Sequence, residues 1–89
     1  MDLPDDVVDD ARRRLHRVKG QVEAIERMLV AQRECRDVVT QVSAASRALE
    51  QVGFRLVAAG LSYCLEHPEE AAADGYPLEV IERMFTKLA

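Results

Sequence analysis

Two cysteines, Cys35 and Cys64, carry the most reactive chemistry in the sequence. No proline lies between them, and apolar residues recur at helical spacing over the whole interval. On one helix, about 29 residues hold the thiols roughly 43 Å apart, whereas a disulfide needs Cα atoms about 4.4–6.8 Å apart. The two thiols of one chain therefore cannot meet, but antiparallel packing of two copies would bring Cys35 beside the partner's Cys64. The spacing predicts a homodimer with two symmetric two-thiol sites.

Such a two-thiol site has three chemical interpretations. The cysteines can be inert, because a buried cysteine often serves as a small hydrophobe. They can bind Cu(I), which accepts few soft thiolates and for which His67 is the nearest additional donor; zinc usually requires four ligands. They can also react with oxidised sulfur, which requires only a nucleophile and a second thiol within reach. Arg33, Arg36 and a helix N-terminus surround Cys35, so we expect Cys35 to be the nucleophile.

A second group of functional residues lies in the basic run at residues 12–19, which reads Arg-Arg-Arg-Leu-His-Arg-Val-Lys. The whole chain has a net charge of −4, which argues against general nucleic-acid binding, but a local basic patch can still bind phosphate selectively. The residues that we expect to contact DNA phosphates are Arg13, Arg14, Arg17 and Lys19. The alternative is a solvated helix face with ion pairs such as Asp10–Arg14.

Two long helices and one short helix must position these residues. The first should begin near Pro4 and end around residues 32–34, and the second should run from Arg36 to Glu66, where Pro68 stops it. We expect a polar turn at residues 67–77. An amphipathic helix from Leu78 to Leu88 should then fold back on the dimer as a lid beside a thiol site.

The second long helix carries two apolar stripes, and one of them includes Gly53 and Gly60. A helix with two such stripes must pack against two partners, of which one can be the first helix and the other must come from a second chain. The two glycines would let that second chain approach closely.

Composition narrows the class of protein. The 89 residues suit one small domain over 1–89, and 48% hydrophobic residues with only 4% aromatic ones favour an all-α fold. No apolar run approaches the roughly 20 residues of a membrane span, and the acidic N-terminal segment is not a signal peptide, so we expect a cytoplasmic protein. No catalytic triad, phosphate-binding glycine loop or carboxylate pair is evident, so an enzyme is not expected.

Several segments follow one another in a distinctive order: Arg-Leu-His-Arg-Val-Lys-Gly-Gln-Val at 14–22, Ile-Glu-Arg-Met-Leu at 25–29, the segment 34–44 around Cys35, Leu49-Glu50, and Cys64. In this order they resemble the copper-sensing operon repressor family, which also contains nickel/cobalt, formaldehyde and persulfide sensors. The resemblance implies an antiparallel helical-bundle dimer that assembles into a tetramer and represses an operon. An inducer at a cross-subunit site would lower the affinity for operator DNA.

The resemblance also suggests which inducer is sensed. Copper sensors of this family have a histidine four residues before the second cysteine, where this chain has Gly60. The nickel/cobalt branch has N-terminal histidines, and the formaldehyde branch has a proline in place of Asp2. The chain therefore looks most like the persulfide-sensing sulfurtransferase repressors. The predicted function is a DNA-binding repressor that senses persulfide or polysulfide through Cys35 and the partner's Cys64, without a metal cofactor.

Two alternatives stay open. One is a Cu(I)-responsive repressor in which Cys35, Cys64 and, as a further candidate, His67 bind the metal. The other is a structural helical interaction module with inert cysteines.

Overall fold

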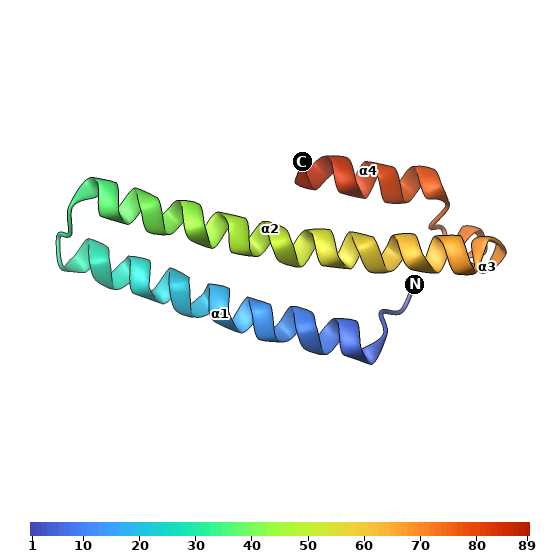
Figure 1. The fold of residues 1–89 in the computed structure, drawn as a ribbon, viewed down its shortest axis with the longest axis horizontal. Coiled ribbons are helices and arrows are strands. Elements are labelled where there is room, and N and C mark those ends of the chain that lie inside the picture. Colours follow the sequence, from blue (N-terminus) through green and yellow to red (C-terminus); the bar gives the residue numbers. More distant parts are fainter.

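The computed structural model describes residues 1–89 and contains four helices and no strands. Helix α1 (Asp5–Val30) and helix α2 (Cys35–Glu66) form an antiparallel hairpin, as Figure 1 shows. A short α3 (Pro68–Ala73) turns the chain at the end of α2, and α4 (Leu78–Leu88) returns along the C-terminal half of α2. The predicted all-α fold and the two long helices are confirmed, although α1 ends at Val30, two residues before the predicted end. The short C-terminal helix folds back on α2 of its own chain.

Local sequence explains where the two long helices meet. After α1, Gln32 adopts a positive φ of 54°, a conformation that ends a right-handed helix. The side chain of Glu34 then accepts a hydrogen bond from the backbone N–H of Arg36 at 2.7 Å and so caps the start of α2. Helix α2 begins at Cys35, one residue before the predicted start, so this cysteine occupies the first helical position.

The prediction of a polar turn over residues 67–77 is wrong in part. Residues 68–73 form α3, because Pro68 occupies the first helical turn, where its missing N–H is not needed, and three alanines follow. Pro68 therefore ends α2 and starts a new helix at the same point. Gly75, with a φ of 84°, reverses the chain direction before α4.

One small apolar cluster lies in the C-terminal half of the chain and consists of Val57, Cys64, Ala71 and Ile81. Three further apolar residues are buried, Val18 on α1 and Ala45 and Val52 on α2. Only 8 of the 89 residues are buried, which is too small a core to cover the apolar surface of helices this long.

Much of that apolar surface therefore stays exposed. Helix α1 presents one stripe of half-exposed residues spaced by two turns, and α2 presents another towards its N-terminal end. The stripes consist of Leu15, Val22 and Leu29 on α1 and Val39, Val42 and Leu49 on α2. None of the helices is both long and apolar enough to cross a membrane.

Candidate functional site

The two cysteines lie at opposite ends of α2, which is a single helix of 32 residues. The predicted separation of about 43 Å within one chain follows from that length, so the two thiols of one chain cannot meet. About eight helical turns separate them, which places both thiols on the same face of α2. Their surroundings differ, because Cys35 is exposed and Cys64 is buried.

The surroundings of Cys35 are polar and open. One of its neighbours, Glu34, caps the helix through the N–H of Arg36. The other arginine expected to act on the thiol, Arg33, lies 3.8 Å from the carboxylate of Asp37 and forms an exposed ion pair with it. Within this chain, nothing blocks the approach of a reagent or a second subunit to Cys35.

The surroundings of Cys64 are apolar and closed. Its side chain is only 8% exposed and packs in a cluster with Val57, Ala71 and Ile81. The cover comes from α3 and α4, since Ala71 and Ile81 belong to those helices. Sequence reasoning identified Cys64 but not this burial, which depends on how the C-terminal segment folds back.

A polar pair flanks the buried thiol. The hydroxyl of Tyr63 donates a hydrogen bond to Asp74 at 3.3 Å, which ties α2 to the turn before α4. Burial, and then the negative charge of Asp74, raise the pKa of Tyr63 above its ordinary value of 10.0. The rings of Tyr63 and His67 lie 5.8 Å apart, and His67 is the exposed cap residue that follows α2.

Gly60 lies one helical turn before Cys64, and other side chains occupy the space next to it. A Cβ placed there would come within 3.1 Å of Cδ1 of Ile81 and 3.8 Å of the terminal methyl of Met1. Nothing at this position can donate to a metal ion. Within one chain, no three Cys, His, Asp or Glu side chains cluster in a way that could hold one.

The basic residues do not form one cluster. Arg14 and Arg17 line a groove of about 320 Å³ between α1 and α2. Arg13 lies on another side of α1, in an open depression of about 340 Å³ that it shares with Asp9, Arg12 and His16. Lys19 is exposed and lines neither of them.

Two glutamines complete the groove, and sequence reasoning missed both. Gln21 comes from α1, and Gln51 comes from α2 together with Ala48. The side-chain oxygen of Gln21 is buried and has no hydrogen-bond partner. Helical spacing from Arg14 and Arg17 could have identified Gln21 as a residue of the groove. Gln51 reaches the groove only because of how α2 is aligned against α1 in the hairpin.

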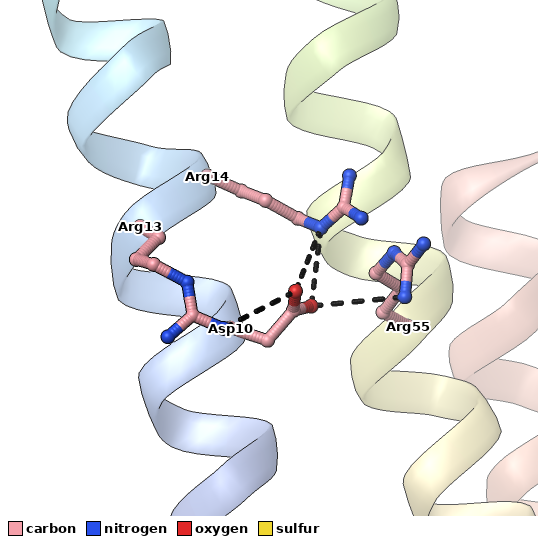
Figure 2. Close-up of polar contacts among 4 residues, drawn as sticks. All are labelled: Asp10, Arg13, Arg14 and Arg55. Atoms are coloured by element: carbon pink, nitrogen blue, oxygen red, sulfur yellow. Dashed lines mark hydrogen bonds and ion pairs between the residues drawn. The ribbon is translucent and has the colours of Figure 1, made fainter.

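Asp10 connects three arginines, as Figure 2 shows. Its carboxylate accepts hydrogen bonds from Nε of Arg14 at 3.1 and 3.3 Å, and it lies 4.0 Å from Arg13 and 3.7 Å from Arg55 of α2. The predicted Asp10–Arg14 pair is therefore present. Because the bonds use only Nε of Arg14, its terminal nitrogens remain able to donate to another anion.

Comparisons with known proteins add to this geometry. Residues 8–89 match the family model described as "metal-sensitive transcriptional repressor". The copper-sensing transcriptional repressor RicR of Mycobacterium tuberculosis (strain ATCC 25618 / H37Rv) is 42% identical over 69 residues, which cover 78% of this chain and 69% of RicR. The copper-sensing transcriptional repressor CsoR of Bacillus subtilis (strain 168) is 33% identical over 57 residues, which cover 64% of this chain and 56% of CsoR. No solved structure matches the chain.

Proposed function

Because the chain belongs to the family of metal-sensitive transcriptional repressors, we propose that it binds operator DNA and releases it when an inducer engages Cys35 and the partner's Cys64. The resemblance to the copper-sensing operon repressor family is confirmed, and the protein is a repressor rather than an enzyme. The observation that carries the proposal is the position of both thiols on one face of a single long helix. A repressor acts where the DNA is, which supports the predicted cytoplasmic location.

Cu(I) is the first candidate inducer. Both relatives are named as copper-sensing repressors, and soft thiolates are the ligands that Cu(I) prefers. Cys35 and the partner's Cys64 would hold the ion, and bound Cu(I) would link the two subunits. His67 is a candidate third donor, because it is exposed and follows Cys64 by about one turn. This assignment replaces persulfide as the leading inducer, although sequence reasoning ranked the two the other way.

Reactive sulfur is the second candidate, and Gly60 favours it. This position has no donor atom and lies against Ile81, whereas sulfur chemistry needs only the two thiols. The thiolate of Cys35 would attack the outer sulfur of an organic persulfide, break its S–S bond and release a thiol. The thiolate of the partner's Cys64 would then attack the sulfur of Cys35, form an interchain disulfide and release hydrosulfide.

A second copy of the chain is the partner that the exposed apolar stripes support. The stripes on α1 and α2 remain uncovered in a single chain, and exposed apolar area of this kind marks an interaction surface. In the proposed dimer, the two α2 helices run antiparallel and cross near Leu49–Gln51, which lie midway between the two cysteines. A tetramer of two such dimers would present several copies of the DNA-binding residues.

The groove between α1 and α2 is the proposed core of the DNA interface. Arg14 and Arg17 would bind phosphate through their guanidinium groups, and the amide of Gln51 would add a hydrogen bond. Arg13 and Lys19 would contribute from the neighbouring surface. Leu15 and Val22 each follow a groove residue by one position, so the apolar stripe lies about 100° around α1 from the groove. A shift of α1 at the subunit interface would therefore also move the groove.

The test uses fluorescence anisotropy with labelled DNA from upstream of the gene that encodes this protein. We expect tight binding that weakens with salt, and release on addition of either Cu(I) or an organic persulfide. Release by Cu(I) alone supports the first inducer, and release by persulfide with a reducible interchain crosslink supports the second. Binding that neither compound changes would contradict a thiol-responsive repressor.

A further inference from the structure

The first residues of the chain are held against the C-terminal half of α2. Residues 1–4 precede α1, and chain ends of this kind are usually poorly ordered unless specific contacts tie them down. Here the side chain of Met1 is only 8% exposed, and its ammonium group lies 3.7 Å from the carboxylate of Asp74. Figure 1 shows this end of the chain beside the C-terminal half of α2. Burial and an ion pair therefore fix the position of Met1.

The carboxylate that binds Met1 also binds α2. Asp74 accepts a hydrogen bond from the hydroxyl of Tyr63 at 3.3 Å, through the same oxygen that faces the ammonium group of Met1. Tyr63 directly precedes Cys64 in the sequence. Asp74 therefore joins the N-terminal residue to the turn of α2 that carries the buried thiol.

The far end of the Met1 side chain lies beside Gly60. Its terminal methyl is 3.8 Å from the point where a Cβ of Gly60 would be, and Cδ1 of Ile81 is 3.1 Å from the same point. Gly60 and Cys64 are four residues apart, a spacing that brings Cβ positions within about 5–6 Å on one face of a helix. Of the two side chains next to Gly60, only Met1 has a donor atom, because its thioether sulfur is bonded to that methyl. A soft sulfur donor thus lies next to the turn that precedes Cys64.

From these contacts, we propose that the thioether of Met1 is a third ligand for Cu(I), beside the thiolates of Cys64 and the partner's Cys35. Thioether and thiolate sulfurs are the soft donors that select Cu(I). Methionine suits this role because its three rotatable bonds let the sulfur turn towards the thiol while the ammonium group stays on Asp74. The inference rests on the proposed two-thiol site and on Cu(I) as its inducer, and it names a further ligand for that site.

Two other side chains near Cys64 carry donor atoms. His67 is exposed and offers an imidazole nitrogen, which is a harder donor than thioether sulfur. Met84 of α4 packs against the apolar cluster that contains Cys64. Because the residues of α4 before and after it meet Gly60 and Gly53, Met84 lies beside the part of α2 that precedes Gly60, further from the thiol. The geometry therefore favours Met1, and both other residues can be tested against it.

The first test measures the affinity of the full chain for Cu(I) by competition with the chelator bathocuproine disulfonate. The chain is released from a cleavable N-terminal fusion, so that its first residue can be chosen and its amine stays free. Met1→Leu conserves the volume of the side chain and removes the sulfur. We expect its Kd for Cu(I) to rise by about tenfold or more, since even the loss of an outer-shell partner costs this much. Met84→Leu is the matched control and should leave the Kd unchanged.

X-ray absorption identifies the ligand directly. The chain has three methionines, so selenomethionine labelling of Met28→Leu/Met84→Leu places the only selenium at residue 1. The Cu(I) complex of this variant should show a copper–selenium path. Absence of that path, or an unchanged Kd in Met1→Leu, would overturn the role of Met1 and leave the two-thiol site intact.

Two further outcomes separate this inference from the proposals on which it rests. Weaker Cu(I) binding in His67→Ala, with Met1→Leu unchanged, would overturn the inference and assign the third ligand to His67. Failure of the wild type to bind one Cu(I) per chain would overturn both the Met1 ligand and Cu(I) as the inducer.

Discussion

The carboxylate of Asp10 holds Nε of Arg14 at 3.1 Å, and the same carboxylate lies within 4.0 Å of Arg13 and Arg55. One negative charge therefore lies among three arginines beside the groove proposed to bind DNA and offsets part of their positive charge. Its effect on DNA binding can be measured directly.

Asp10→Asn should tighten DNA binding, because it removes a negative charge that competes with phosphate for the arginines. At low salt we expect the Kd to fall by about two- to fivefold, with a steeper dependence on salt. Asp6→Asn is the matched control, because it changes the net charge equally, and Asp6 is an exposed acid that forms no ion pair with these arginines. Weaker binding by Asp10→Asn would mean that the carboxylate positions Arg14 rather than neutralising it.

Arg14→Ala/Arg17→Ala should weaken binding to all DNA sequences by a similar factor. If each arginine contacts one phosphate, the slope of log K against log salt should flatten by about 0.9 for each lost contact. Gln51→Ala should weaken binding without changing this slope, because it removes no charge. An unchanged affinity in the double variant would exclude the groove as the DNA interface.

Removal of each cysteine in turn should show whether Cu(I) or reactive sulfur is the inducer. If Cu(I) is the inducer, Cys35→Ala and Cys64→Ala should both lose the release of DNA, because each thiolate is a ligand. If reactive sulfur is the inducer, Cys64→Ala should still become persulfidated at Cys35 but should form no interchain crosslink. Intact-protein mass spectrometry and anisotropy together distinguish these results. A full response in Cys35→Ala would contradict both.

Tyr63 should make stability depend on pH in the alkaline range. Burial and Asp74 raise its pKa above 10.0, so the folded state retains the phenol proton more tightly than the unfolded state. This contribution is fully present below the unfolded pKa and is lost as the pH rises through the folded one. Urea midpoints should therefore fall more steeply above about pH 10 in the wild type than in Tyr63→Phe. Asp74→Asn should show a smaller drop than the wild type, since it removes the negative charge that disfavours the phenolate.

Gly20→Ala should stabilise the protein, because no atom lies within 4 Å of where its Cβ would be. Alanine in the middle of a helix is favoured over glycine by roughly 0.5–1 kcal/mol. Gly53→Ala should gain less or lose stability, because its Cβ would come within 2.7 Å of Leu88. Thermal unfolding of both variants measures the difference. A destabilised Gly20→Ala would indicate that a second subunit packs closely against this glycine.

Sequence patterns predicted α4 from Leu78 to Leu88 and placed the start of α2 within one residue of Cys35, because caps and helical spacing are local properties. Helix α3 was missed because Pro68 signals both the end of one helix and the start of another. The burial of Cys64 and the position of Gln51 in the groove depend on contacts between distant segments. No local sequence pattern encodes these contacts, so the burial of Cys64 and the position of Gln51 become visible only in the folded structure.

The length of α2 has a consequence for how sharply such a dimer would respond. In the proposed dimer, two-fold symmetry would put one thiol site at each end of the paired helices, about 43 Å apart. Closing one site would fix the two helices at that end and leave them free to change their crossing angle about it. Closing the second would remove the remaining freedom, and the second closure would be entropically cheaper because the first has already aligned the rods. The release of DNA should then rise steeply with the concentration of inducer, with a Hill coefficient above one.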